Sequence, residues 1–262
     1  YGFGSSEEIV GRAINRYSKR DDIVLATKVF FQMHPGPGGG GLSRVGILEQ
    51  VDACLRRLGT DYVDLLQIHR LDPDVRVEET MEALHDVVKA GKVLHIGASS
   101  MWAWQFITAQ QVAERNGWTQ FATMQNHYNL VYREEEREML PYCEATGVAS
   151  IPWSPLARGL VTRDRGAVTS RVETDEYAKV LYGTANLEIL DAVASIASER
   201  GVSRAAVGLA WVSRHPAVTA PIVGFTKPHH LDDALASLDI ELTADEVQRL
   251  EAPYTPQPVQ GH

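Results

Sequence analysis

Short apolar runs alternate with longer amphipathic patterns along most of the chain. Residues 62–68 form a run of β-branched, aromatic and leucine side chains with one acid, which predicts a buried strand. Residues 43–58, just before it, carry apolar side chains at helical spacing behind Ser43, a typical helix N-cap. The same apolar pattern predicts further strands at residues 23–29, 93–97, 121–125, 148–153 and 219–223.

Helical patterns separate these strands and close the chain. They are expected at residues 78–90, 101–115, 133–145, 186–200, 203–213, 229–238 and 244–251, with another behind Ser5. The acidic run Glu134–Glu136 is interpreted as a solvated face at the positive end of a helix dipole. The weakly patterned stretch after Gly159, to about Thr184, predicts a loop or lid.

The strict alternation of strands and helices implies parallel strands joined by right-handed crossovers. Two architectures meet this condition, an open doubly wound sheet and a (β/α) barrel. An open sheet concentrates its site at one switch point, whereas a barrel gathers every strand end around one mouth. Residues able to bind or react stand at the carboxyl ends of all the predicted strands: Lys28, His69, Ser99, Gln125, Trp153 and Gly224. We therefore predict an α/β fold of the barrel class, with residues 1–262 forming a single barrel domain.

Composition narrows the class of protein. Hydrophobic residues make up 44% of the chain and charged residues 23%, as in an ordinary globular protein. The net charge of −9 argues against a nucleic-acid surface or an anchor to an anionic membrane. Cys54 and Cys143 lie inside helical patterns and are typical of buried thiols in a reducing cytosol, so a cytoplasmic location is expected. No metal-ligand pattern stands out, and the oligomeric state is left open.

One glycine-rich stretch imitates a nucleotide-binding motif. Residues 36–41 satisfy G-x-G-x-x-G, and Asp61 follows at the spacing of a ribose-binding acid. The fingerprint should form the turn between a strand and its helix, but here it begins well after the strand and Ser43 caps the helix beyond it. We interpret it as a flexible loop over the barrel mouth.

Several short motifs occur together in a fixed order. They lie at residues 1–11, 26–29, 61–69, 97–100, 125–126, 153–159 and 223–228. In sequence and spacing the chain resembles the aldo-keto reductases, NADPH-dependent carbonyl reductases with a (β/α)8 TIM barrel, from Tyr1 to about Glu251. The likeness is greatest to a bacterial branch that also resembles the β subunits of voltage-gated potassium channels. It implies that six of the eight barrel units are visible in this chain.

The resemblance implies a catalytic set of aspartate, tyrosine, lysine and histidine. The tyrosine matches Tyr1, the lysine Lys28 and the histidine His69. The aspartate, the first strand, the first helix and the second strand would precede Tyr1, so we expect an amino-terminal segment missing from the printed sequence. In this chemistry the tyrosine hydroxyl protonates the carbonyl oxygen, and the lysine ammonium lowers the tyrosine pKa, which is about 10 in water. The histidine orients the carbonyl.

The same resemblance implies a set of cofactor-binding residues. Ser99 and Gln125 match the pair that holds the nicotinamide carboxamide, and Ser100 stands where relatives often carry Asn or Arg. Trp153 matches the aromatic that stacks on the nicotinamide. The pyrophosphate strip matches Ser154, Leu156 and Arg158, and the adenosine 2′-phosphate and adenine site matches Gly224, Thr226, Lys227, His230 and Asp233.

Lys227 near a helix start favours NADPH over NADH. His230 and Asp233 depart from the family pattern, which implies looser adenine binding.

Three functions remain open at this level. The first is a reductase or dehydrogenase acting on a small carbonyl or alcohol, the second a cofactor-binding regulatory subunit with little turnover, and the third an inactive scaffold. Intact Lys28 and His69, and the lack of an interaction tail, favour the first. The substrate would be selected by the glycine-rich loop, by Trp102 and Trp104, by the loop after Trp153 and by the C-terminal tail.

Overall fold

The computed structural model describes residues 2–165 and 175–260. The chain falls into two compact units, Tyr1–Met124 and Gln125–His262. Tyr1 and residues 166–174 of the predicted lid lie outside the described residues. No helix among residues 2–165 and 175–260 combines the length and apolar character needed to cross a bilayer. The expectation of one barrel domain stays a prediction.

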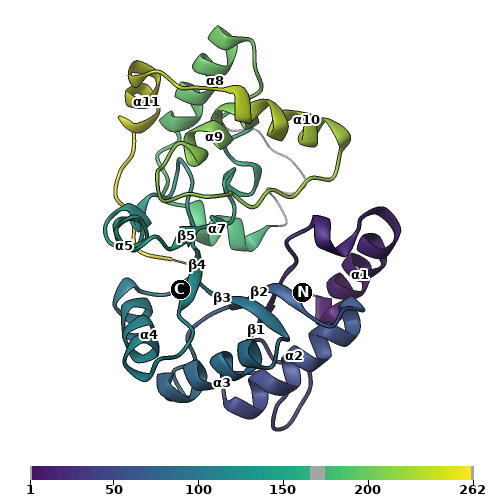
Figure 1. The fold of residues 1–262 in the computed structure, drawn as a ribbon. Helices are drawn as coiled ribbons and strands as arrows, with labels where there is room; N and C mark the ends of the chain where they lie inside the picture. Colours follow the sequence, from purple (N-terminus) through teal and green to yellow (C-terminus); the bar gives the residue numbers. More distant parts are fainter. Residues whose placement is uncertain (1, 166–174, 261–262) are drawn as a thin grey trace. The chain divides into compact units, whose positions relative to one another are not determined.

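Strands and helices alternate in the first unit, as the sequence predicts. The strands are β1 (Ala26–Val29), β2 (Val63–Ile68), β3 (Val93–Ser99) and β4 (Phe121–Gln125). The helices are α1 (Ser5–Tyr17), α2 (Arg44–Leu58), α3 (Val77–Lys89) and α4 (Ala103–Asn116), with 3₁₀ turns at Gly2–Gly4 and Arg20–Asp22. Neighbouring strands follow chain order, and β1–β2 and β2–β3 run parallel. Helices α2 and α3 pack along these strands (Figure 1).

The strand register decides which side chains share a face of this sheet. Leu66 of β2 is fully buried and pairs with Thr27 of β1. The Thr27 hydroxyl donates to Glu7 of α1, with 2.5 Å between the oxygens, so this face is the one that the helices cover. Successive residues of a strand point to opposite faces. The next register pair, Lys28 and Gln67, therefore lies on the face away from the helices.

Helix α2 begins and ends where its sequence predicts. The Ser43 side chain accepts a hydrogen bond from the Gly46 N–H at 3.2 Å, which satisfies one of the free donors of the first turn. Gly59, with φ 69°, ends the helix in the left-handed conformation that glycine adopts without strain. The Ser43 cap is thus confirmed, and it fixes where the chain leaves the glycine-rich loop.

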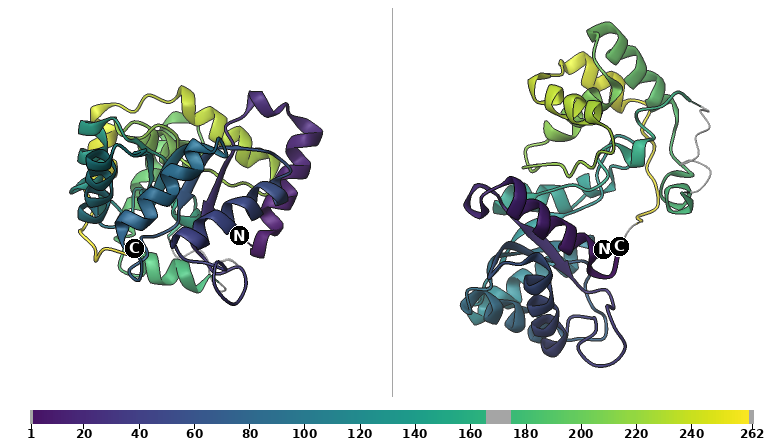
Figure 2. Two further views of the ribbon diagram at one scale, coloured as in Figure 1. Left: turned by 60° about the horizontal axis from the view of Figure 1, so that its bottom comes forward. Right: turned by 90° about the vertical axis from the view of Figure 1, so that its right-hand side faces the viewer.

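The second unit is mostly helical. Its elements are β5 (Ala149–Ser150), α5 (Met139–Thr146), α7 (Glu176–Tyr182), α8 (Glu188–Arg200), α9 (Arg204–Ser213), α10 (Pro228–Ala236) and α11 (Ala244–Glu251), with 3₁₀ turns at Glu134–Glu136, Ala157–Gly159 and Ser237–Asp239. Figures 1 and 2 show α8 to α11 gathered together, in green to yellow. Their shared core includes Trp211, Val193 and Leu250, all fully buried.

The predicted strand at residues 219–223 is not regular. Val218 forms a parallel bridge with Ser150, and the backbone N–H groups of Thr219 and Ile222 donate to the carbonyls of Ser150 and Pro152. Pro221 has no N–H to donate, so a continuous ladder is interrupted there. The segment therefore lies where a strand was predicted, without the regular pairing that was expected.

The prediction that the acidic run Glu134–Glu136 forms a solvated face was wrong. The predicted helix at residues 133–145 is broken into the turn Glu134–Glu136 and α5, and Glu134 and Glu135 are buried. Glu134 accepts hydrogen bonds from the Tyr254 hydroxyl at 2.6 Å and from the Gln257 N–H at 2.8 Å. These partners come from the C-terminal tail, which local sequence could not place, and they hold the pKa of Glu134 below its usual value despite burial.

Candidate active site

The face of the first unit's sheet away from the helices carries the predicted catalytic residues. Lys28 lies near the end of β1, and His69 follows β2 two residues beyond Gln67, the register partner of Lys28. The His69 N–H donates to the Val29 carbonyl at 3.0 Å, which extends the parallel pairing to His69. The structure therefore brings Lys28 and His69 to the same end of the same face, as the sequence predicts.

Burial sets the protonation of both groups. It lowers the pKa of Lys28 to about 8, because the charged ammonium loses hydration. It also lowers the pKa of His69 to about 3, and the positive charge of Lys28 adds to the effect. His69 is therefore a neutral imidazole at physiological pH, with one ring N–H able to donate to an oxygen. The Phe31 ring packs on the imidazole, with 4.6 Å between the ring centroids.

The predicted serines close the neighbouring strand. Ser99 and Ser100 are both buried at the end of β3, and their hydroxyl oxygens lie 3.4 Å apart. Ser100 has φ 41°, a left-handed backbone conformation that a non-glycine residue rarely adopts. Such local strain is typical of residues held for binding or catalysis. Gln125, the other predicted carboxamide ligand, is buried at the end of β4, and its pairing with Ser99 stays a prediction.

Sequence reasoning missed a polar layer beneath these residues. Gln67 is almost fully buried, and its Nε2 makes no hydrogen bond within the described part of the chain. The buried Thr123 Oγ1 likewise has no partner there. Gly97 lies beside both, and a Cβ at Gly97 would stand 2.1 Å from Thr123 Oγ1. The signal in the sequence was Gln67, a glutamine inside a mostly apolar strand run.

In the second unit, the strip from Ser154 to Arg158 is strongly bent. Ser154, Ala157 and Arg158 have φ of 52°, 48° and 55°, although none is a glycine. The Ala157 N–H donates to the Ser154 carbonyl at 2.9 Å and closes the turn. Three left-handed residues so close together are costly, so the surrounding contacts must hold this strip in place.

A cavity of about 770 Å³ opens beside this strip. The predicted cofactor residues that line it are Ser154, Leu156, Arg158, Gly224, Thr226, His230 and Asp233. Ser203 and Arg204 at the start of α9 and His229 at the start of α10 line it too, so two helix amino ends meet the cavity. Helix amino ends and arginines suit phosphate groups, and the volume suits part of a dinucleotide. Ser203 also caps α9 by accepting the Ala206 N–H at 3.1 Å.

Lys227 and Trp153, both predicted to bind the cofactor, do not line this cavity. Lys227 is exposed at the N-cap position of α10. It lies in the chain between Thr226 and His229, which both line the cavity. Trp153 is half-buried, and its ring stacks on the His127 ring with 4.2 Å between centroids. The Trp153 N–H donates to the Asn126 carbonyl at 2.9 Å, which anchors the start of the bent strip.

Both arginines of the cavity face carboxylates. Arg158 Nε lies 2.7 Å from an Asp175 oxygen, and Asp175 also caps α7 by accepting the Ala178 N–H at 3.0 Å. Arg204 Nη2 lies 2.5 Å from Asp164, whose side chain is largely exposed. A phosphate entering the cavity would therefore meet cations whose charge is already balanced.

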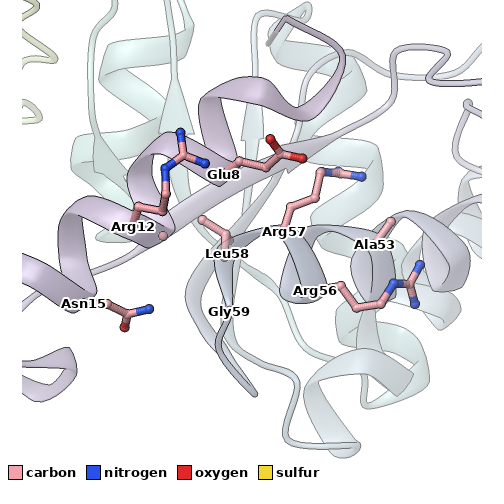
Figure 3. A pocket seen from close by; sticks show the side chains of 9 residues that line it. Glu8, Arg12, Asn15, Ala53, Arg56, Arg57, Leu58 and Gly59 are labelled. Carbon is pink, nitrogen blue, oxygen red and sulfur yellow. The ribbon is translucent and has the colours of Figure 1, made fainter.

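A second cavity, of about 410 Å³, lies in the first unit between α1 and α2 (Figure 3). Glu8, Arg12 and Asn15 line it from α1, and the end of α2 forms its other wall. Gly11 lets the helices cross closely, since a Cβ there would stand 2.4 Å from the Leu58 carbonyl oxygen. None of the predicted site residues lines it, and we interpret it as the groove beside a close helix crossing.

Comparison with known proteins identifies the family. The pattern of the Aldo/keto reductase family matches residues 1–254. The versiconal hemiacetal acetate reductase of Aspergillus parasiticus is 46% identical over 282 residues, covering 99% of this chain and 82% of that protein.

Two further relatives are named aldo-keto reductases. One, from Metarhizium robertsii, is 44% identical over 297 residues, and covers 100% of this chain and 78% of its own length. One from Alternaria alternata is 43% identical over 288 residues, with the same coverage of 100% and 78%. These relatives are fungal, and the expected likeness to a bacterial branch stays a prediction. The chain belongs to the aldo/keto reductase family, whose fold is the (β/α)8 barrel, and it is an oxidoreductase.

Proposed function

We propose that the protein reduces an aldehyde or ketone to an alcohol, reversibly, with NADPH as the hydride donor. The observation that carries this proposal is the pairing of Lys28 with a neutral His69 at one end of one sheet face. Family membership supports carbonyl reduction in general, and its members use NAD(P)H. The named residues and the choice of NADPH are our proposal.

His69 acts as a hydrogen-bond donor to the carbonyl oxygen. An imidazole whose pKa is about 3 holds no extra proton to give at physiological pH, so it is suited to orienting a substrate rather than protonating it. As negative charge develops on the oxygen during reduction, the same N–H stabilises it. The Phe31 ring packs on the imidazole, and the resulting loss of hydration strengthens such a bond.

Tyr1 is the general acid of this proposal, and Lys28 lowers its pKa. Tyr1 lies outside the described residues, so its role rests on the family resemblance alone. The requirement on Lys28 is that it carries charge when the tyrosine gives up its proton, because a nearby ammonium stabilises the phenolate. With a pKa of about 8, Lys28 is mostly charged at neutral pH but loses that charge in mild alkali.

The cavity of the second unit is the proposed cofactor site. Its shape and donors fit the phosphates of a nicotinamide dinucleotide, which supplies the hydride when it is bound. Arg158 and Arg204 would hold the phosphates, and the exposed Lys227 would meet the adenosine 2′-phosphate that distinguishes NADPH from NADH. By the family resemblance, Trp153 would support the nicotinamide ring, and the carboxamide role of Ser99, Ser100 and Gln125 stays a prediction of that resemblance.

A spectrophotometric assay of NADPH oxidation tests the proposal directly. The purified protein is mixed with NADPH and a panel of aldehydes and ketones, and NADPH oxidation is followed by absorbance. We expect turnover with at least one carbonyl class, and a loss of about a hundredfold or more in kcat in His69→Ala. Binding of NADPH without turnover on any carbonyl would contradict the reductase and favour a regulatory subunit.

A further inference from the structure

A buried polar cluster lies behind Trp153, outside every motif noted in the sequence. The Tyr182 hydroxyl and His127 Nε2 lie 2.7 Å apart and share a hydrogen bond. Asn129 Nδ2 donates to the same hydroxyl at 3.3 Å. All three side chains are buried and belong to the second unit, with Tyr182 at the end of α7. None of them lines the cavity.

His127 supports the Trp153 indole from behind. Its ring is nearly parallel to Trp153, at 10° and 4.2 Å between centroids, and to Tyr132, at 14° and 4.2 Å. Two rings can stack so closely on one imidazole only from opposite faces, so His127 is held between Tyr132 and Trp153. The Tyr182 hydroxyl and Asn129 Nδ2, at 2.7 and 3.2 Å from His127 Nε2, hold the edge of the stacked imidazole in place.

Asn129 supports the bent strip next to Trp153. Its Nδ2 donates to the Ser154 carbonyl at 3.0 Å, while its Oδ1 accepts the Val131 N–H at 3.0 Å. The Val131 N–H thus holds the Asn129 amide in place, and the amide in turn holds the Ser154 carbonyl. Ser154, with φ 52°, is the first of the left-handed residues of the strip, and this bond offsets part of the cost of that conformation.

We propose that Tyr182, His127 and Asn129 are positioning residues that hold the Trp153 indole and the Ser154 backbone ready for the nicotinamide end of the cofactor. This inference rests on the proposed function. Tyr182 at the end of α7 thus joins this cluster, while Asp175 at the start of the same helix pairs with Arg158.

Tyr182→Phe tests the inference with the smallest change. It keeps the ring and removes only the hydroxyl that fixes His127 and Asn129. We expect the Kd for NADPH to rise about three- to tenfold, the effect of one or two hydrogen bonds. Binding of adenosine 2′,5′-bisphosphate, the NADPH fragment that lacks the nicotinamide, should stay unchanged. Both affinities can be measured by calorimetry.

Tyr254→Phe is the matched control. The Tyr254 hydroxyl, on the C-terminal tail, also makes two hydrogen bonds within the second unit, to Glu134 and from the Arg133 N–H. The Tyr254→Phe variant should therefore lose a comparable free energy of unfolding, without a change in its affinity for NADPH or for the fragment. His127→Gln gives a second test, since it removes the ring under Trp153, and it should also weaken NADPH binding selectively.

Each outcome points to a different conclusion. Selective loss of NADPH affinity in Tyr182→Phe and His127→Gln supports the positioning role. Unchanged NADPH affinity in both variants, or equal weakening of NADPH and the fragment, overturns it while the proposed function stands. A wild-type protein that binds neither ligand overturns the proposed function, and this inference with it.

Discussion

At the scale of single residues, burial decides the chemistry of this site more than contact with opposite charge does. Lys28 and His69 both have a lowered pKa, and loss of hydration is the larger cause in each. The sequence could indicate both residues, because each stands at the end of a strand run. It could not indicate their protonation, which depends on side chains from separate strands that surround them.

The pH dependence of reduction should report Lys28. Its ammonium is present below a pKa of about 8 and is lost above it, so kcat/KM for reduction should fall as pH rises through about 8. The arginine of Lys28→Arg keeps its charge in alkali, so the alkaline fall in kcat/KM should move to higher pH. This holds even if the substitution lowers the maximal kcat/KM. Initial rates across the pH range provide the measurement. A wild-type limb at the same pH as that of Lys28→Arg would contradict the assignment.

Lys28 should also lower the stability of the fold. Both the folded and the unfolded chain hold its proton below pH 8, where the cost of burying the charge is therefore fully present. As pH rises from about 8 toward the ordinary lysine pKa of 10.5, the folded lysine gives up its proton first and the cost disappears. Lys28→Met should therefore be more stable than wild type at pH 7, by up to about 3 kcal/mol. Chemical unfolding should show the difference shrinking in alkali, and a constant difference would refute this origin.

Cofactor choice is tested at Lys227. This exposed residue precedes α10, where its charge and the helix amino end both favour a phosphate. Lys227→Ala should weaken NADPH binding about tenfold and leave NADH binding nearly unchanged. Lys227→Arg is the control that keeps the charge. An equal loss of affinity for NADPH and NADH in Lys227→Ala, or no loss for NADPH, would show that Lys227 does not bind the 2′-phosphate.

At the scale of elements, local patterns predict the helices and strands well where the signal is local. The cap at Ser43 and the strand β4 lie where the sequence places them. The prediction fails where distant segments decide. Glu134 is buried by the C-terminal tail, and the 219–223 segment lies along β5 without regular pairing. Helix α7 lies within a stretch predicted as a loop or lid.

The pair Arg158–Asp175 should restrain cofactor binding. Asp175 neutralises an arginine that lines the cavity, and it caps α7 with the same carboxylate. Asp175→Asn keeps an oxygen for the cap and removes the charge. NADPH should then bind about two- to fivefold more tightly, as Arg158 loses a competing partner. Asp191→Asn, which breaks the exposed pair with Arg165 outside the cavity, is the control. Weaker binding in Asp175→Asn would show that the carboxylate positions Arg158 instead.

The close crossing of α1 and α2 depends on Gly11. A Cβ there would meet the Leu58 carbonyl oxygen at 2.4 Å, so the helices must move apart in Gly11→Ala. Alanine favours a helix by about 1 kcal/mol over glycine, but the lost packing outweighs this, and we expect a net loss of about 1–2 kcal/mol. Thermal unfolding measures this loss of stability. Arg12→Ala, at the neighbouring exposed position of α1, is the control. Higher stability in Gly11→Ala would show that the contact is not tight.

At the scale of the whole molecule, the fold class and the family could be predicted from sequence because they rest on many short motifs in order. The candidate site could be predicted only in part. Residues of the motifs, such as Ser154 and Arg158, line one cavity. Arg204 and Tyr182 come from segments without a motif, and only the folded chain brings them to the strip. Their roles depend on contacts far apart in sequence, which no local pattern encodes.

The central claim is hydride transfer from a nicotinamide cofactor to a carbonyl carbon. The most direct measurement uses NADPH carrying deuterium at the transferable position, incubated with the protein and an aldehyde that it consumes. Mass spectrometry of the alcohol should show one deuterium on the carbinol carbon, and His69→Ala should slow its appearance. An alcohol without the label, or no alcohol from any aldehyde or ketone tested, would contradict the account.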